Sequence, residues 1–267
     1  MAKIDAAAFD ITFLETLAQR DTPVHRLDPR AKLLVTAAFV LAVVSADKYA
    51  ISGLLIFLLY PVAMVGLADL PARYLAGKVL LVMPFALLVG AFNPLLDRQV
   101  LVVIGPVEIA GGWISFVSIV LRSLLTVSAA LILIATSGFP SICLALERLH
   151  VPRMFTIQLL FLYRYLFVLA GEARRMVRAR ALRSFGRRGL GPQVAASLMG
   201  HLLLRTLARA RRIHLAMLCR GFDGEIRILR QLRLSGRDAV FVLAWSGLFL
   251  LLRLCNVPLL LGGLLAG

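Results

Sequence analysis

Two short arginine motifs stand out in the basic stretch between residues 171 and 237. Each arginine precedes a small residue and then an aromatic one, in Arg183-Ser184-Phe185 and Arg220-Gly221-Phe222. The stretch holds sixteen arginines, no lysine and three acids, so its net charge is 16 − 3 = +13. Arginine presents a planar fork that makes two parallel bonds to a carboxylate, which lysine cannot do. This composition favours a docking surface for a soluble partner with acidic grooves.

Two other interpretations would also account for the charge of the basic stretch. A solvated cytoplasmic region in contact with anionic lipid head groups would carry the same charge. A nucleic-acid site is disfavoured, because aromatic residues do not interleave with the arginines as stacking platforms would. The docking interpretation is the more specific one, because an arginine projected from a helix end into a partner's pocket acts as an interface anchor.

Long helices are expected to position both arginines. The apolar segment Phe155–Ala170 runs without a break into Glu172–Arg183, which predicts one continuous helix. A second helix is predicted over Gln193–Arg220, with Pro192 in its first turn. Gly221 is the expected residue after its C-terminus. Each arginine would therefore lie at the end of a helix.

The rest of the chain is typical of a polytopic membrane protein. Of its 267 residues, 60% are hydrophobic, and its mean hydropathy is +0.89. Apolar segments of about 20 residues match the thickness of a bilayer and must be helical within it. Five core spans are predicted, at about Leu33–Ala46, Ala50–Ala68, Val79–Leu96, Trp113–Thr136 and Ala239–Cys255. A short hairpin is expected within Asp97–Gly112, between the third span and the fourth.

The distribution of basic residues predicts the orientation. The expected outer loops hold only Lys48 and Arg98, whereas the inner segments hold nearly all the other basic residues. The N-terminus is therefore placed in the cytoplasm, and the first 30 residues, with five acids, contain no signal peptide.

Few residues suggest chemistry within the membrane. Arg122 lies inside the fourth span, so it either faces a protein interior or extends towards the head groups. Arg164 lies near an edge of the Phe155–Ala170 segment, which is expected to be only partly embedded in the membrane. No catalytic or nucleotide-binding motif is present, and the four histidines and three cysteines lack the spacing of metal ligands. No catalytic residue and no metal site are therefore assigned to this chain.

Several motifs together resemble one family, the transmembrane T components of energy-coupling factor transporters, and most closely the CbiQ type of cobalt and nickel uptake systems. The resemblance covers nearly the whole chain. It rests on Leu27-Asp28-Pro29-Arg30 with Lys32, Phe92-Asn93-Pro94, Arg122, the run Tyr163–Met176 that includes Arg164 and Glu172, Leu182-Arg183-Ser184 and Cys219-Arg220-Gly221. The last motif departs from the family's frequent Ala-Arg-Gly, since Cys219 replaces the alanine.

The resemblance implies an all-α, roughly L-shaped fold with two long cytoplasmic coupling helices. Arg183 and Arg220 would each enter a groove on one of two ATP-binding cassette subunits. Closure of those subunits on ATP would move the coupling helices and reorient a separate substrate-binding S component, similar to CbiM. ATP and magnesium would belong to the ATPase subunits and cobalt or nickel to the S component, so this chain would hold no cofactor and catalyse no reaction.

The resemblance also implies a bacterial inner-membrane location, contact with lipid, a place for a small accessory membrane subunit and a link to cobalamin biosynthesis. The chain would then divide into an N-terminal cytoplasmic segment (1–32), a membrane domain of about four spans (33–136), a re-entrant and coupling-helix region (137–237) and a final span with an outer tail (238–267). Two alternatives are a T component of a vitamin transporter and a self-contained secondary transporter or channel. The second is disfavoured by the scarcity of intramembrane charges and of internal repeats.

Overall fold

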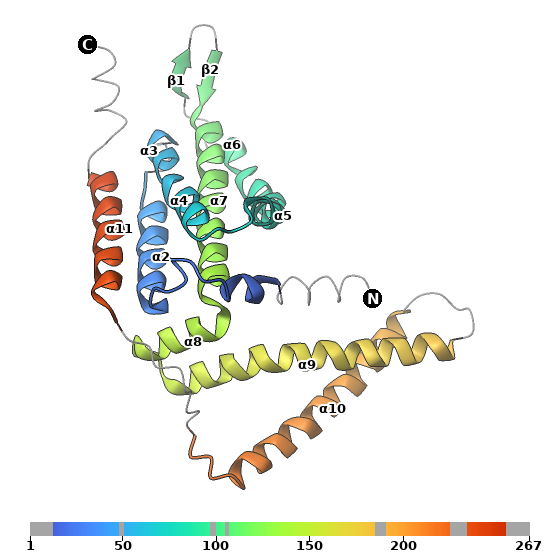
Figure 1. The fold of residues 1–267 in the computed structure, drawn as a ribbon. Helices are drawn as coiled ribbons and strands as arrows, with labels where there is room; N and C mark the ends of the chain where they lie inside the picture. Colours follow the sequence, from blue (N-terminus) through green and yellow to red (C-terminus); the bar gives the residue numbers. More distant parts are fainter. Residues whose placement is uncertain are drawn as a thin grey trace. The chain divides into compact units, whose positions relative to one another are not determined.

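A computed structural model of the chain describes residues 13–47, 51–96, 100–104, 107–184, 191–224 and 234–254. These residues are helical apart from their connections and one antiparallel hairpin, so the all-α prediction is confirmed (Figure 1). They form two compact units: Thr16–Gly138 with Leu232–Gly267, and Met1–Glu15 with Phe139–Gln231. Predictions that fall on Lys48, Arg98, Phe185, the break at 186–190 and the tail at 256–267 lie outside the described residues.

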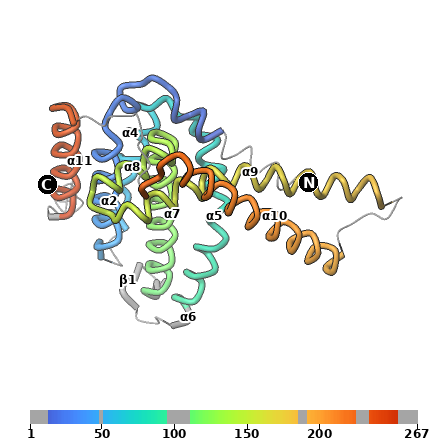
Figure 2. Tube along the Cα trace, turned by 90° about the horizontal axis from the view of Figure 1, so that it is seen from below, coloured from blue at the N-terminus to red at the C-terminus, as the bar shows by residue number. Residues whose placement is uncertain are grey.

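The first unit contains most of the apolar helices. They are α2 (Pro29–Val44), α3 (Ile51–Ile56), α4 (Leu59–Leu67), α5 (Ala72–Gly90), α6 (Asn93–Leu96), α7 (Gly111–Ser137) and α11 (Gly236–Leu254). Helices α11, α2 and α7 run side by side with their axes nearly parallel, and α5 packs on α7 (Figures 1 and 2). The expected hairpin is confirmed as β1 (Val100–Ile104) and β2 (Val107–Ala110), which pair antiparallel.

The second predicted span differs from its prediction, because it is split into α3 and α4. Proline at position 61 has no N–H to donate to the carbonyl of Phe57, and its ring crowds that carbonyl. Phe57 and Leu58 instead donate to carbonyls three residues earlier, Leu54 and Leu55, which tightens the chain at the break.

Three of the described helices are long and apolar enough to cross a membrane: α5, α7 and α9 (Arg153–Arg183). Helix α9 contains the segment that the sequence placed only partly in the bilayer. Helix α2, with 16 residues, is shorter than the roughly 20 residues of a typical span. The chain is therefore a multi-pass membrane protein, although its apolar helices differ in length more than the sequence predicted.

An aromatic cluster forms the centre of the first unit. The ring of Phe39 on α2 lies 4.6 Å from Tyr60 on α4 and 5.3 Å from Phe249 on α11. Trp245 of α11 meets Tyr60 edge to face at 5.0 Å. Phe39, Tyr60 and Phe249 are buried. Contacts of this kind add to the stabilisation that burial provides, so they hold α2, α4 and α11 together.

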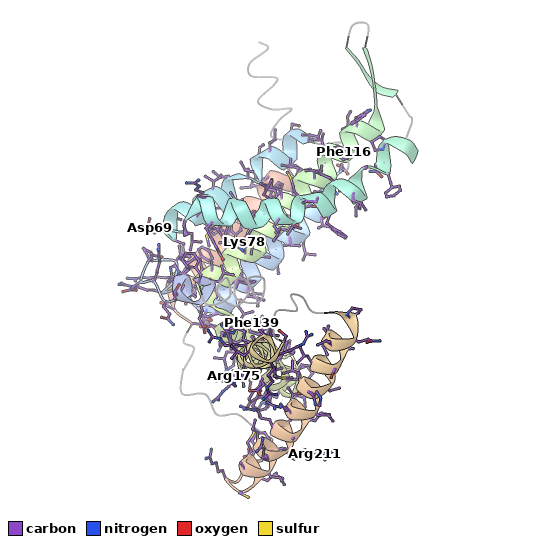
Figure 3. The ribbon with its side chains drawn as sticks, turned by 90° about the vertical axis from the view of Figure 1, so that its right-hand side faces the viewer. Asp69, Lys78, Phe116, Phe139, Arg175 and Arg211 are labelled. Atoms are coloured by element: carbon purple, nitrogen blue, oxygen red, sulfur yellow. The ribbon has the colours of Figure 1, made fainter. Side chains whose placement is uncertain are left out.

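The second unit consists of α8 (Phe139–Arg148), α9 and α10 (Pro192–Leu218). Phe139 at the start of α8 stacks on Tyr163 of α9 at 4.8 Å. Helix α10 crosses α9 and then diverges from it (Figures 1 and 3). The prediction of one continuous helix through residue 183 is confirmed, as is Pro192 as the first residue of α10. Helix α10 ends at Leu218, two residues before the predicted Arg220.

Candidate functional site

The first arginine motif lies at the C-terminus of α9. Arg183 is the last residue of the helix and is exposed, and Leu182 beside it is 78% exposed. The hydroxyl of Ser184 donates to the carbonyl of Ala181 at 3.0 Å and so satisfies one of the free carbonyls at the helix end. Ser184 itself has a φ of −92°, so this cap residue lies outside the left-handed region.

The second motif ends α10 by a different mechanism. The N–H of Phe222 donates to the carbonyl of Met217, and the N–H of Gly221 donates to that of Leu218, each at 3.0 Å. Gly221 has a φ of +77°, as expected for the glycine of a Schellman motif. Arg220 and Cys219 are exposed at this turn. The predicted role of Gly221 is confirmed, and it fixes the direction in which the backbone leaves Arg220.

A carboxylate joins the two long helices at their crossing. Oε1 of Glu172 on α9 accepts from Arg205 on α10 at 2.7 Å, and Oε2 accepts from Arg175 at 2.6 Å. The Glu172 side chain is mostly buried, at 17% exposure. The sequence did not single out this contact. The feature of the sequence that could have indicated this contact is that Glu172 is one of only three acids in a stretch with sixteen arginines.

Arg122 binds the end of another helix. From α7, its two terminal nitrogens donate to the carbonyl of Val44, the last residue of α2, at 3.3 Å and to that of Ala46, just beyond the helix, at 2.8 Å. A cation is favourable there because the last carbonyls of a helix lack partners within the helix. Arg253 of α11 binds the carbonyl of Ser45 at 2.6 Å. These contacts place the Arg122 guanidinium against the end of the first predicted span.

Arg164 has a different environment from Arg122. It lies in the middle of α9 with an exposed side chain. Among the described residues, no ion pair or hydrogen bond to its guanidinium is found. The two arginines proposed as membrane charges therefore belong to separate units.

The Leu27–Lys32 motif forms a buried polar cluster at the other end of α2. Asp28 caps the helix by accepting from the N–H of Arg30 at 2.9 Å. Lys32 is 2% exposed and donates to the carbonyl of Thr136, near the end of α7, at 2.9 Å. Asp238 of α11 accepts from the N–H of Asp28 at 2.8 Å. The motif therefore ties α2 to both α7 and α11.

His25 borders this cluster. Its Nδ1 is 2.7 Å from the hydroxyl of Thr22, and its carbonyl lies 3.5 Å from Nζ of Lys32. Burial, and then the nearby positive charge of Lys32, lower the pKa of the His25 imidazole below its usual value. Its position suits a neutral ring that takes part in packing. No group of three or more potential metal ligands occurs within the part of the chain that the structure describes.

Comparison with known proteins identifies the family. The family model described as the cobalt transport protein CbiQ matches residues 20–229, a range that contains both arginine motifs and the Leu27–Lys32 motif. The chain belongs to the CbiQ family. The resemblance that the motifs indicated is therefore confirmed, and a transporter family accords with the apolar helices.

Individual relatives of the CbiQ family match different lengths of the chain. The cobalt transport protein CbiQ of Salmonella typhimurium is 36% identical over 109 residues, which are 40% of this chain and 48% of that protein. An uncharacterized protein of Methanocaldococcus jannaschii is 27% identical over 134 residues, 49% of this chain and 46% of its own. The chain thus matches about half the length of these two relatives.

A third relative matches nearly end to end. The energy-coupling factor transporter transmembrane protein EcfT of Heliobacterium modesticaldum is 28% identical over 256 residues, covering 88% of this chain and 93% of that protein. Its name describes a transmembrane protein of a transporter, and the CbiQ family is described as a cobalt transport protein. This CbiQ-family chain is accordingly a component of the same broad transporter class.

Proposed function

We propose that this chain is the coupling subunit of an energy-coupling factor importer for cobalt or nickel ions. The observation that carries the proposal is the pair of exposed arginines, Arg183 and Arg220, at the ends of two long helices. Glu172 and Arg205 join these helices at their crossing. A force applied at either arginine would reach the crossing through a continuous helix, because a helix transmits displacement along its axis.

Two ATP-binding cassette subunits are the proposed partners of the arginines. Leu182, Ser184, Cys219 and Gly221 would flank the arginines in acidic grooves, where a guanidinium gains most from a carboxylate. ATP and magnesium would be bound by those subunits and the transported ion by an S component similar to CbiM. The chain itself would hold no cofactor and hydrolyse no ATP. A small accessory membrane subunit would complete the complex.

The proposed location is the bacterial inner membrane with the N-terminus in the cytoplasm. The excess of arginine between residues 171 and 237 supports this orientation. In this orientation the chain would divide into four topological segments: 1–32, 33–136, 137–237 and 238–267. Both arginine motifs would then face the compartment that supplies ATP.

A vitamin importer is the second candidate, because the EcfT relative matches more of the chain than the CbiQ relative does. The two candidates share the arginine contacts and differ in the S component. Uptake assays with radiolabelled cobalt, nickel and a vitamin, in cells with each type of S component, separate them. Uptake that appears only with a vitamin S component would replace the ion proposal.

Charge reversal tests the coupling role. The chain is co-expressed with the ATPase subunits and an S component, and Arg183→Glu with Arg220→Glu is expected to abolish both ATPase co-purification and ion uptake. Arg178→Glu with Arg211→Glu is the matched control, since both arginines are exposed on the same helices away from their ends. Normal assembly and uptake in the first pair, or equal losses in both pairs, would refute the proposal.

A further inference from the structure

An apolar groove lies between α9 and α10. Its volume is about 430 Å³, and its walls include Phe161, Leu162, Tyr165 and Leu166 from α9 with Leu207 and Ile213 from α10. The groove belongs wholly to the second unit, so its shape depends only on how these two helices cross. Figure 3 looks along α9 and shows α10 passing beside it.

A polar pocket adjoins this groove. It has a volume of about 290 Å³, and its charged lining consists of Glu172, Arg205, Arg209 and Arg212. Leu169, Thr206 and Arg209 line both the pocket and the groove. The two cavities therefore meet, and Arg209 lies where the apolar lining gives way to the basic one.

The charges in the pocket are unbalanced. Glu172 binds Arg205 and also Arg175, so its charge is already shared between two guanidinium groups. Arg209 and Arg212 have no ion-pair partner among the described residues. Three arginines and one glutamate give the pocket a charge of 3 − 1 = +2. An anion would satisfy donors that the protein leaves free.

We propose that the pocket and the groove together bind one anionic phospholipid. Its phosphate would lie among Arg205, Arg209 and Arg212, whose planar forks suit phosphate oxygens. An acyl chain would occupy the groove lined by Phe161 and Leu166, where it replaces water on an apolar surface. Lipid is the favoured occupant because the site joins a basic half to an apolar half, and a free phosphate would use only the first.

The membrane supplies this ligand directly. Helix α9 is apolar enough to enter a bilayer, and the groove begins on its apolar part, at Gln158 and Phe161. Basic residues near an anionic leaflet each gain about 1 kcal/mol, which is about a fivefold change in affinity. The site would make the angle between α9 and α10 sensitive to lipid composition. This inference requires neither the ATPase partners nor a particular transported ion.

The test measures lipid retention by the purified full chain without ATPase subunits, so its outcome is separate from the coupling role. Native mass spectrometry after titration with phosphatidylglycerol or phosphatidylcholine gives the two affinities. We expect one tightly held phosphatidylglycerol. Arg209→Gln with Arg212→Gln should weaken it about 25-fold, the product of two fivefold effects. Arg178→Gln with Arg211→Gln, which leaves the cavities intact, should change it less than threefold.

Two further sets of variants separate lipid binding from a folding defect and from the binding of a free phosphate. Glu172→Gln removes the competing carboxylate and should tighten phosphatidylglycerol binding, the opposite direction from a folding defect. Leu166→Asn with Ile213→Asn should weaken the lipid but leave the binding of glycerol 3-phosphate unchanged. The proposal would be overturned by equal binding of the two lipids or by equal losses in the Arg209/Arg212 and Arg178/Arg211 variants. Full displacement of the lipid by glycerol 3-phosphate would also overturn it. A polypeptide segment of a partner subunit found in the groove would do the same.

Discussion

The backbone N–H of Asp28 donates to Oδ1 of Asp238 at 2.8 Å, although 210 positions separate the two residues. Oδ2 of the same carboxylate accepts from the N–H of Ser235 at 2.7 Å. One buried side chain therefore binds the residue that caps α2 and a residue just before α11. The two helices are joined where both begin, next to the Lys32 contact with α7.

Removal of the Asp238 carboxylate should destabilise the first unit. Asp238→Ala leaves the buried N–H of Asp28 and the part-buried N–H of Ser235 without their acceptor, and we expect a loss of about 2 kcal/mol in the free energy of unfolding. Asp238→Asn keeps one acceptor and should cost less. Chemical unfolding in detergent provides the measurement. Asp47→Ala is the control, because that carboxylate is 81% exposed and lies 3.8 Å from Arg253. Equal stability of all three variants would contradict the assigned contact.

Loss of the Arg122 guanidinium should free the C-terminus of α2. Arg122→Gln removes the charge from the carbonyls of Val44 and Ala46, which we expect to cost about 1–2 kcal/mol of stability. Arg164→Gln should be nearly neutral, because Arg164 is exposed. Thermal unfolding of the two variants in the same detergent compares them. An equal effect of both substitutions would mean that Arg122 does not act as a helix cap.

Gly200 within α10 and Gly221 just after it should respond to alanine with opposite signs. Gly221→Ala places a side chain at a φ of +77°, where no neighbouring atom interferes, so the backbone alone is strained by about 1 kcal/mol. Gly200→Ala lies inside the helix with open space around it and should stabilise α10 by up to about 1 kcal/mol. Amide hydrogen exchange along α10 reports both effects. Unchanged exchange at the helix end in the Gly221 variant, or faster exchange around position 200 in the Gly200 variant, would contradict these expectations.

Acidification should weaken the region around His25. Its pKa is lowered in the folded chain, so the unfolded chain takes up the proton first as the pH falls. The stability that this histidine contributes is present above about pH 6.5 and is lost as the pH falls towards the folded-state pKa. Unfolding free energies measured from pH 7.5 to pH 5 should decline in the native chain. His25→Gln should flatten that decline, and an unchanged slope would exclude His25 as its source.

Local sequence patterns predicted much of the secondary structure. Pro192 begins α10 because its fixed φ suits a first helical turn, and Gly221 ends the same helix because glycine tolerates a positive φ. Position 61 shows the limit of this approach. The same local chemistry that splits α3 from α4 was available in the sequence, yet continuous apolar composition suggested one span across it.

Roles that depend on distant partners could not be predicted in the same way. Arg122 looked equally suited to a polar interior and to the head groups, and its contact with the carbonyl of Ala46 depends on how α7 packs against α2. The sequence named Glu172 only as part of the Tyr163–Met176 run, and its bond to Arg205 depends on how α10 crosses α9. In both residues the sequence specifies the charge but not its partner.

By itself, then, the amino-acid sequence determined the helical class, the membrane character and the family, because apolar composition and helix-end residues act over a few positions. The tertiary structure alone decided that Asp28 meets Asp238 and that the basic pocket adjoins the apolar groove between α9 and α10. The physical reason is that hydrogen bonds and cavities require two segments in one place, and helix packing sets that arrangement.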